Sequence, residues 1–399
     1  MMRMRTGVVA TAATLAVITT LIATGAEARP QYAAREGMNC VSCHLDPDGG
    51  GLRNGNGFSY QRGRHAFEVE PKFEEWPADP ELAKGVRIGS DLRATGLSYD
   101  VSRHDDDGGD LDYPRTYASF AMQGAVYLGF TPSDHVVLYY SHDIAASNQK
   151  ERDWYGMLRG LTGLNLYVKA GQMRTPYGIR LDDHSAFVRG QQNNPPGEEG
   201  MMDVNPRDTY PGIEVGFVKK NVFAHVAYQD AAGSSSPNFT KFEEKMVNGR
   251  VGIQAGHLFV GGSARYNGQG DGDDMTQSTR VGAFAMYGQR AFALLAQVDA
   301  GENQFSGALG DEQVQGALLQ AEVYLGRAVA VRGEFDYMDF TDQDSDVLTR
   351  SARRYSGALD WNPVPFFKLS GEARLVSNST IDHDGLDETW GLLAAVFSY

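Results

Sequence analysis

The only two cysteines of this 399-residue chain lie in the segment Cys40-Val41-Ser42-Cys43-His44. Two thiols at this spacing, followed directly by a histidine, form the attachment pattern of a c-type haem. Each thiol can form a thioether with one porphyrin vinyl group, and the histidine is then placed to coordinate the iron from the proximal side. A disulfide is the structural alternative, but the adjacent histidine weighs against it. We therefore predict one covalent haem c held by Cys40, Cys43 and His44.

The sixth iron ligand is less constrained by the sequence. Met38 and His65 are the candidates in the same segment, and methionine would raise the reduction potential relative to histidine. Met38 lies only two residues before Cys40, so a return to the opposite haem face is awkward, and we favour His65. An open or water-ligated position, or a ligand from the barrel lumen, is the alternative. A peroxidase is disfavoured because no distal pair of histidine and arginine is recognisable near the motif.

Residues 1–28 have the features of a secretory signal. Two arginines near the start precede the mostly apolar segment 8–24, and residues 26–28 supply small side chains for cleavage, so we expect the mature chain to begin at residue 29. Beyond the signal, no stretch approaches the roughly 18 consecutive apolar residues that a spanning helix needs. Any insertion into a membrane must therefore use a closed barrel.

Residues 29–84 form the segment that carries the haem motif. This segment is rich in glycine, including the run at 49–51, and contains too little apolar material for an independent core. A segment this small normally needs a cofactor, or contact with another part of the protein, in order to be stably folded. We predict that it docks as a plug against the rest of the chain, residues 85–399.

After residue 84 the sequence alternates between apolar and polar residues. Leu166 and Val168, for example, alternate with Tyr167 and Lys169, which puts apolar groups on one face of a strand. Segments of about ten residues with this period are the signature of transmembrane barrels. The composition is also typical of a barrel, since the chain has 47 Gly, 19 Tyr and 19 Phe but only 15 Pro. The predicted fold class is all-β, a transmembrane antiparallel barrel with a small N-terminal haem c plug.

The count of alternating segments gives about 16 strands. They lie near 86–97, 116–130, 135–146, 153–161, 164–174, 212–219, 222–230, 246–255, 258–267, 278–288, 291–300, 313–325, 328–339, 351–361, 366–376 and 388–399. The segment 153–161 has the weakest pattern, and its loss with a neighbour would leave fourteen. Short and long connections alternate along the chain, as they do in outer-membrane barrels with short periplasmic turns and longer outer loops.

The same alternation directs charged side chains into the lumen. Those expected there are His135, His225, His257, Arg87, Arg93, Arg250 and Arg265. An interior arginine would suit haem propionates, although the sequence does not identify which one. The long connection after Arg174 contains Pro176 and Gly178, so we expect it to fold inward as a constriction. His184 in that loop is either a metal or proton site or, more simply, a solvated loop histidine.

Charge limits the classes of partner. The chain has 51 acidic and 36 basic residues and a net charge of −15, which excludes nucleic acid as a natural ligand. Many of the acids fall in the long loops, for example Asp105, Asp106 and Asp107. They are either solvated tips bridged to lipopolysaccharide by divalent ions or a means of concentrating a cationic donor such as ferrous iron.

The signal segment, the single haem motif, the glycine-rich stretch and the sixteen-strand pattern together resemble the fused monohaem cytochrome-porin family of bacterial outer membranes. Only Cys40, Cys43 and His44 correspond residue by residue. The resemblance implies a haem plug in or at the mouth of an outer-membrane barrel, embedded in lipid. It also implies electron transfer, rather than conventional enzyme chemistry, between extracellular ferrous iron or another redox substrate and periplasmic c-type cytochromes. A solute porin with a structural or regulatory haem plug is the alternative.

Overall fold

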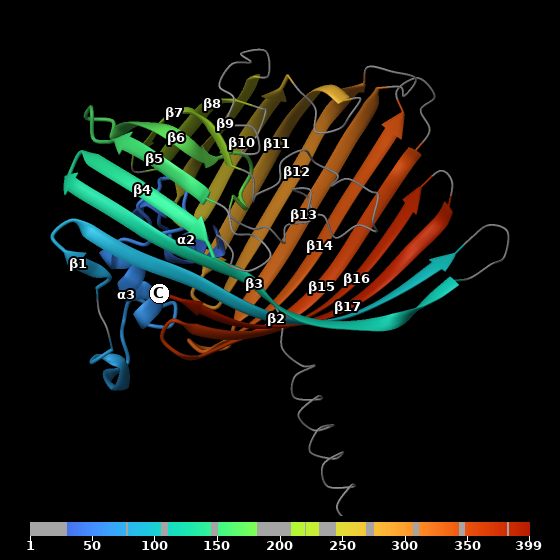
Figure 1. Cartoon of the computed structure of the whole chain (residues 1–399), viewed down its shortest axis with the longest axis horizontal. Coiled ribbons are helices and arrows are strands. Elements are labelled where there is room, and N and C mark those ends of the chain that lie inside the picture. Colours follow the sequence, from blue (N-terminus) through green and yellow to red (C-terminus); the bar gives the residue numbers. More distant parts are fainter. Residues whose placement is uncertain are drawn as a thin grey trace, which may run out of the picture.

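The computed structural model describes residues 30–76, 79–104, 111–144, 151–181, 209–219, 221–230, 245–268, 275–305, 311–342, 348–380 and 383–399. Sixteen antiparallel strands, β2 to β17, form a closed barrel, because each strand pairs with the next and β17 pairs with β2 (Figure 1). A short additional strand, β1, pairs with β2. The predicted all-β barrel and its strand number are therefore confirmed, including the weakest segment, which forms β5.

The strands are β1 (Glu81–Ala83), β2 (Val86–His104), β3 (Leu111–Ser133), β4 (Val136–Asp143), β5 (Glu151–Leu158), β6 (Leu166–Arg174), β7 (Thr209–Lys219), β8 (Val222–Asp230), β9 (Lys245–Ala255), β10 (Leu258–Asn267), β11 (Met275–Gln289), β12 (Phe292–Phe305), β13 (Glu312–Tyr324), β14 (Val329–Asp342), β15 (Leu348–Val364), β16 (Phe367–Thr380) and β17 (His383–Ser398). Several strands extend further toward the long connections than the sequence pattern indicated. The extra residues there are more polar, so the alternation that marks the lipid-facing part fades before the pairing ends.

The connections at one end of the barrel are tight. β9 and β10 are joined by residues 256–257, β11 and β12 by 290–291, and β15 and β16 by 365–366. We call this the short-turn end. Most residues of the long connections, the acidic loop at 105–110 and the signal segment lie outside the described residues.

The barrel exposes apolar side chains and buries polar ones. On β9, Val251 and Ile253 are 53% and 57% exposed, whereas Arg250 and Gln254 are 8% and 7% exposed. The alternation therefore places apolar groups on the outer face and polar groups in the lumen. An outer surface of this kind suits a hydrocarbon environment rather than water.

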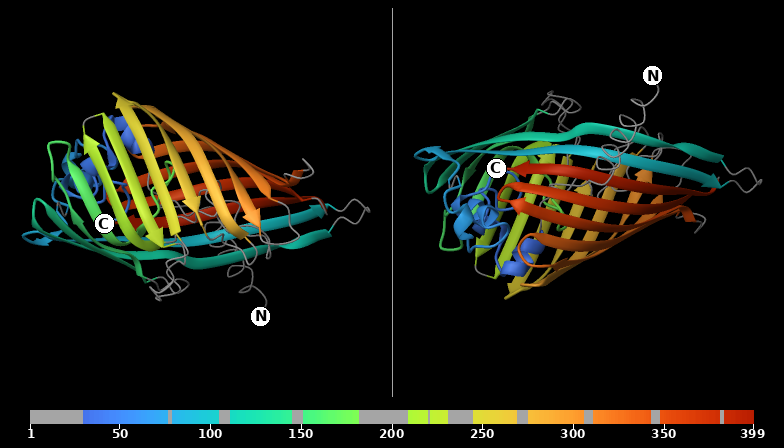
Figure 2. Two further views of the ribbon diagram at one scale, coloured as in Figure 1. Left: turned by 90° about the horizontal axis from the view of Figure 1, so that it is seen from above. Right: turned by 90° about the horizontal axis from the view of Figure 1, so that it is seen from below.

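The N-terminal segment fills the short-turn end of the lumen. Its elements are α2 (Pro30–Glu36), η1 (Cys40–Ser42), α3 (Gly55–Arg62) and η2 (Pro71–Phe73). In Figure 2 the helices of this segment gather at the end of the barrel where the C-terminus lies, and α2 packs against β11 and β12. None of the helices in the described part of the chain is long and apolar enough to cross a membrane. We use "plug" below for residues 30–76.

Candidate functional site

The haem motif forms a compact turn. Cys40–Ser42 is a single turn of 3-10 helix, and the N–H groups of Cys43 and His44 both donate to the carbonyl oxygen of Cys40 at 3.0 Å. Both cysteines are free thiols. The turn therefore gathers two thiols and an imidazole without joining the sulfurs to each other.

One large cavity lies between the plug and the barrel wall. Cys40, Cys43 and His44 all line it, together with Met38 and His65. The cavity has about 1250 Å³ of empty space, including the part open to solvent at its mouth. All five site residues predicted from the sequence meet at this cavity.

The glycine run after the motif wraps closely around Cys40. Gly49 has a φ of 86°, and a Cβ atom at this position would lie 3.2 Å from the Cys40 Cβ and 3.3 Å from its Sγ. A side chain at Gly49 would therefore both strain the backbone and press on the thiol. The absence of a side chain leaves Cys40 facing the cavity.

We expect Gly49→Ala to lower the yield of covalently attached haem severalfold. The substitution adds backbone strain of about 1 kcal/mol and displaces a thiol that would form one of the two thioethers predicted from the sequence. The measurement is haem-dependent peroxidase staining of denatured protein, normalised to the amount of barrel. Gly55→Ala is the matched control, because no atom lies within 4 Å of a Cβ at that plug position. Equal haem yields in the two variants would contradict the expectation.

Burial changes the chemistry of both thiols. It raises the pKa of Cys40, and together with the neighbouring Cys40 it raises the pKa of Cys43 to about 11. Both thiols are therefore neutral at pH 7. Because the thiolate is the form that binds metal ions and attacks disulfides, the pair is a poor site for a free metal ion.

The two candidate distal residues differ in how firmly they are held. The His65 side chain is 9% exposed, and its ring stacks on Tyr32 with the centroids 4.5 Å apart. Arg64 and His65 have φ angles of 56° and 62°, a left-handed conformation that costs a non-glycine residue on the order of 1–3 kcal/mol. Met38 is 37% exposed. The surroundings therefore fix His65 at the cavity, whereas Met38 lies at its more open side.

Apolar contacts seat the plug in the barrel. Leu45 and Leu52 are each 3% exposed and belong to a buried cluster with Tyr139 of β4. The Phe58 ring of α3 lies 4.9 Å, centroid to centroid, from the ring of the C-terminal Tyr399. Burying each large apolar side chain contributes about 1.5–3 kcal/mol. The plug is thus packed against the wall rather than suspended in the lumen.

An ion-pair network joins the plug to the opposite wall. The Lys169 Nζ atom of β6 lies 3.3 Å from Asp46 Oδ1, 2.9 Å from Asp48 Oδ2 and 3.0 Å from Glu214 Oε2. Asp46 and Asp48 belong to the plug, whereas Glu214 is on β7. Lys169 is 1% exposed and Glu214 is fully buried. We call these residues with Arg250, whose Nη2 lies 3.0 Å from Asp48 Oδ1, the plug lock.

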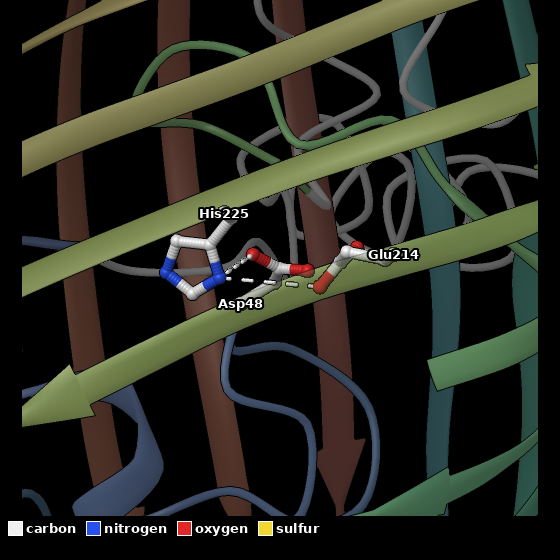
Figure 3. Close-up of side chains that lie close together, drawn as sticks. All are labelled: Asp48, Glu214 and His225. Atoms are coloured by element: carbon white, nitrogen blue, oxygen red, sulfur yellow. Dashed lines mark ion pairs between the residues drawn. The ribbon is translucent and has the colours of Figure 1, made fainter. Parts of the chain in front are cut away.

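Part of the plug lock has the composition of a metal site. Asp48, Glu214 and His225 offer ligand atoms within 4.8 Å of one another, and Figure 3 shows Asp48 facing the other two. The ammonium of Lys169 and the guanidinium of Arg250 already neutralise these carboxylates. Burial alone would raise the pKa of Asp48, but the charges of Lys169, His225 and Arg250 outweigh it and hold that pKa well below its usual range. A metal ion would have to displace the ammonium, so the cluster is better described as an ion-pair lock.

The plug lock was not identified from the sequence. Asp46 and Asp48 follow the haem motif directly, and Lys169 lies on the polar face of the predicted strand 164–174. Charged residues at positions expected to face the lumen are the sequence feature that could have indicated this network. Which acid meets which base across the lumen depends on how the plug is docked.

The segment after β6 folds into the lumen, as its Pro and Gly predicted. Within residues 175–181, the Tyr177 hydroxyl donates to Asp299 Oδ1 at 2.7 Å, and Arg180 Nη1 donates to Glu334 Oε1 at 3.2 Å. Tyr177 and Arg180 are 1% and 3% exposed. The inward segment therefore reaches strands β12 and β14. The remainder of this loop, including His184, lies outside the described residues.

Replacing Arg180 by methionine should release the inward segment. Removing one partner of a buried ion pair costs about 3–5 kcal/mol when the other charge is left alone. Here the cost should be smaller, because Glu334 keeps Arg354, whose Nη2 lies 2.6 Å from Glu334 Oε1. The expected result is rapid chymotrypsin cleavage at Tyr177, which is shielded in the parent protein. Arg353→Met, on the exposed face of β15, is the control. Continued resistance of Tyr177 in the Arg180 variant would show that other contacts hold the segment.

Most of the side chains predicted to face the lumen do so. Four of them are at most 8% exposed inside the barrel: Arg93, His225, Arg250 and Arg265. His257 Nδ1 lies 3.1 Å from the Ala34 carbonyl oxygen of α2, and Arg87 pairs with a glutamate of β1. The prediction for His135 is wrong. It is exposed in the β3–β4 turn, 3.0 Å from the Arg159 carbonyl oxygen, because the strand ends before it.

No protein-family model and no curated protein matches the sequence. The structure is similar to an anion-selective porin from Comamonas acidovorans, with a TM-score of 0.56 and 12% identity over 79% of this chain and 99% of that one. It is also similar to a loop-deletion mutant of the outer membrane protein OmpT of Vibrio cholerae (TM-score 0.55, 10% identity, 79% and 99% coverage). The outer membrane channel DcaP of Acinetobacter baumannii gives a TM-score of 0.54 at 11% identity, with 81% and 100% coverage. The chain therefore has a porin-type barrel fold.

Proposed function

We propose that this chain is a bacterial outer-membrane electron-transfer protein with one haem c. Cys40 and Cys43 would hold the cofactor covalently and His44 would coordinate its iron. The chain would pass electrons between an extracellular donor or acceptor, such as ferrous iron, and periplasmic carriers such as c-type cytochromes. The observation that carries the proposal is the convergence of both thiols, the adjacent imidazole and two candidate distal side chains on one large cavity.

The position of the cavity fits this role. Barrels of this kind place their short turns in the periplasm, and the plug fills the short-turn end. The cavity would then open toward the periplasmic carriers, and the lumen would give access from outside. The hydrocarbon layer is about 30 Å thick and insulates electrons, so a redox centre inside the barrel shortens the distance to both partners.

The residues around the cavity supply attachment, orientation and shielding. A bound haem c would supply a one-electron couple, and electron transfer needs proximity and a matched potential rather than an acid–base pair. Gly49 leaves the Cys40 thiol open to the cavity, and His65 is held at its edge by Tyr32. The plug lock keeps the whole segment at one position in the barrel.

A solute porin is the second candidate, and the barrel fold itself favours it. The structural neighbours include an anion-selective porin and an outer membrane channel. Here, however, the plug and the inward segment 175–181 both occupy the lumen. An electron-transfer protein needs no open path for solutes, whereas a porin does.

The test reconstitutes purified protein in liposomes that contain an electron acceptor, with ferrous iron added outside. We expect a spectrum of covalent haem, reduction of the internal acceptor and low ion conductance. The control is Cys40→Ala/Cys43→Ala, which should transfer no electrons. Absence of haem from the parent protein would refute the cofactor assignment. Haem without transfer above the control, or conductance like that of an open porin, would favour the second candidate.

A further inference from the structure

One wall of the cavity is polar and is built from both the plug and the barrel. Arg53 of the plug, Gln123 of β3 and Lys368 of β16 line this wall beside Asp91 of β2 and Ser398 of β17. Arg53 and Lys368 are the two cationic side chains among the described residues of the lining, apart from the histidines. We call this surface the polar wall.

The acid on the polar wall is already satisfied by neutral donors. The Tyr127 hydroxyl donates to Asp91 Oδ2 at 2.9 Å, and the Ser398 hydroxyl donates to Asp91 Oδ1. Arg53 Nη2 in turn donates to Ser398 Oγ at 2.8 Å. Arg53 thus touches this network through one of its five N–H groups. Its charge remains directed at the cavity.

Gln123 supplies an independent sign of a missing polar ligand. Its side chain is 8% exposed, and within the part of the chain that the structure describes its Oε1 atom has no hydrogen-bond partner. Leaving a buried polar atom unsatisfied costs about 1–3 kcal/mol. The amide can turn to offer either its oxygen or its N–H groups, so it can bind a carboxyl group in either protonation state.

We propose that Arg53, Gln123 and Lys368 bind the two propionates of the haem. This inference rests on the proposed function, because it requires the haem to be present. Guanidinium and ammonium groups are the natural partners of carboxylates. The other acids of the lining, Glu36 and Asp48, are engaged away from this wall by Tyr60 and by the plug lock. The propionate edge would therefore face β2, β3, β16 and β17, and the cofactor would join the plug to the barrel.

Lys368 belongs to β16, so the polar wall is formed by the barrel as well as by the plug. Its Nζ lies 3.5 Å from Asp360 Oδ2 of β15, and the side chain is 8% exposed. A propionate bound by Arg53 and Lys368 together would be held from the plug and from the barrel at once.

The test measures the haem reduction potential in the full-length protein by redox titration. Arg53→Gln and Lys368→Met each remove a positive charge, which favours the oxidised, more positive haem. We expect each to lower the potential, with about a tenfold higher ratio of oxidised to reduced haem at a fixed ambient potential, or ~59 mV for a one-electron couple. Arg53→Lys should retain most of the parental potential.

Arg327→Gln is the matched control. It removes the same charge from a turn where Arg327 pairs with Glu68, outside the cavity lining. A shift in the control as large as in the Arg53 and Lys368 variants would mean that only long-range charge matters, and the propionate assignment would be wrong. Absence of any shift would refute it equally. A parent protein without haem would instead refute the proposed function, so the two failures are distinguishable. If Arg53→Gln does not fold, Lys368→Met decides the question.

Discussion

Replacing Lys169 by methionine should turn the plugged barrel into a conducting pore. The ammonium of Lys169 lies within 3.3 Å of Asp46, Asp48 and Glu214. Its loss leaves three carboxylates with only the guanidinium of Arg250 between them, at a cost of about 3–5 kcal/mol. Undocking of the plug relieves this cost, because Asp46 and Asp48 can then reach water. Single-channel recording in planar bilayers should show conductance rising severalfold.

Two variants separate the lock from a general effect of charge. Lys219→Met removes an exposed lysine from the end of β7 and should leave the conductance low. Asp48→Asn combined with Lys169→Met removes one of the uncompensated acids, so the plug should dock better than in Lys169→Met alone. If Lys169→Met conducts no more than the parent, the apolar contacts of the plug suffice and the lock adds little.

Replacing His65 by alanine should convert the haem from a low-spin to a high-spin state. The reason is the loss of the proposed sixth ligand, and identity of the axial ligand is a main determinant of haem potential and spectrum. The visible and near-infrared spectra of the oxidised protein report the change directly. Because Cys40, Cys43 and His44 are unchanged in this variant, the amount of covalent haem should stay at the parental level.

Met38→Leu is the comparison that makes this experiment decisive. Both side chains line the cavity, but only His65 is fixed by stacking on Tyr32. We expect the leucine variant to keep the parental spectrum. A high-spin spectrum in Met38→Leu but not in His65→Ala would assign the methionine instead. Parental spectra in both variants would assign the sixth position to neither residue.

The barrel was largely predictable because its signal is local. A two-residue alternation and the placement of Gly and Pro determine which segments pair and where they turn. All sixteen segments appear as strands, and the tight turns fall where they were expected. His135 was misplaced because alternation specifies a face only while the strand continues, and β3 ends two residues earlier.

The residues of the candidate cofactor site were also specified locally. Cys40, Cys43 and His44 are adjacent in the chain, and attachment chemistry dictates their spacing. The inward segment after Arg174 was recognisable from its turn residues. In each case the informative residues are a few positions apart, so no knowledge of long-range contacts was needed.

The tertiary structure alone decided how the plug is held and what surrounds the cavity. Lys169 meets Asp48 across 121 positions of sequence, and Arg53 meets Ser398 across 345. A charged residue on the lumen face of a strand has many possible ion-pair partners. The sequence pattern does not indicate which of them it meets. Docking of the plug selects among them, because desolvating a charge is tolerated only where a partner is already in place. The sequence by itself thus determined the barrel and the motif, whereas the plug lock and the polar wall exist only in the folded chain.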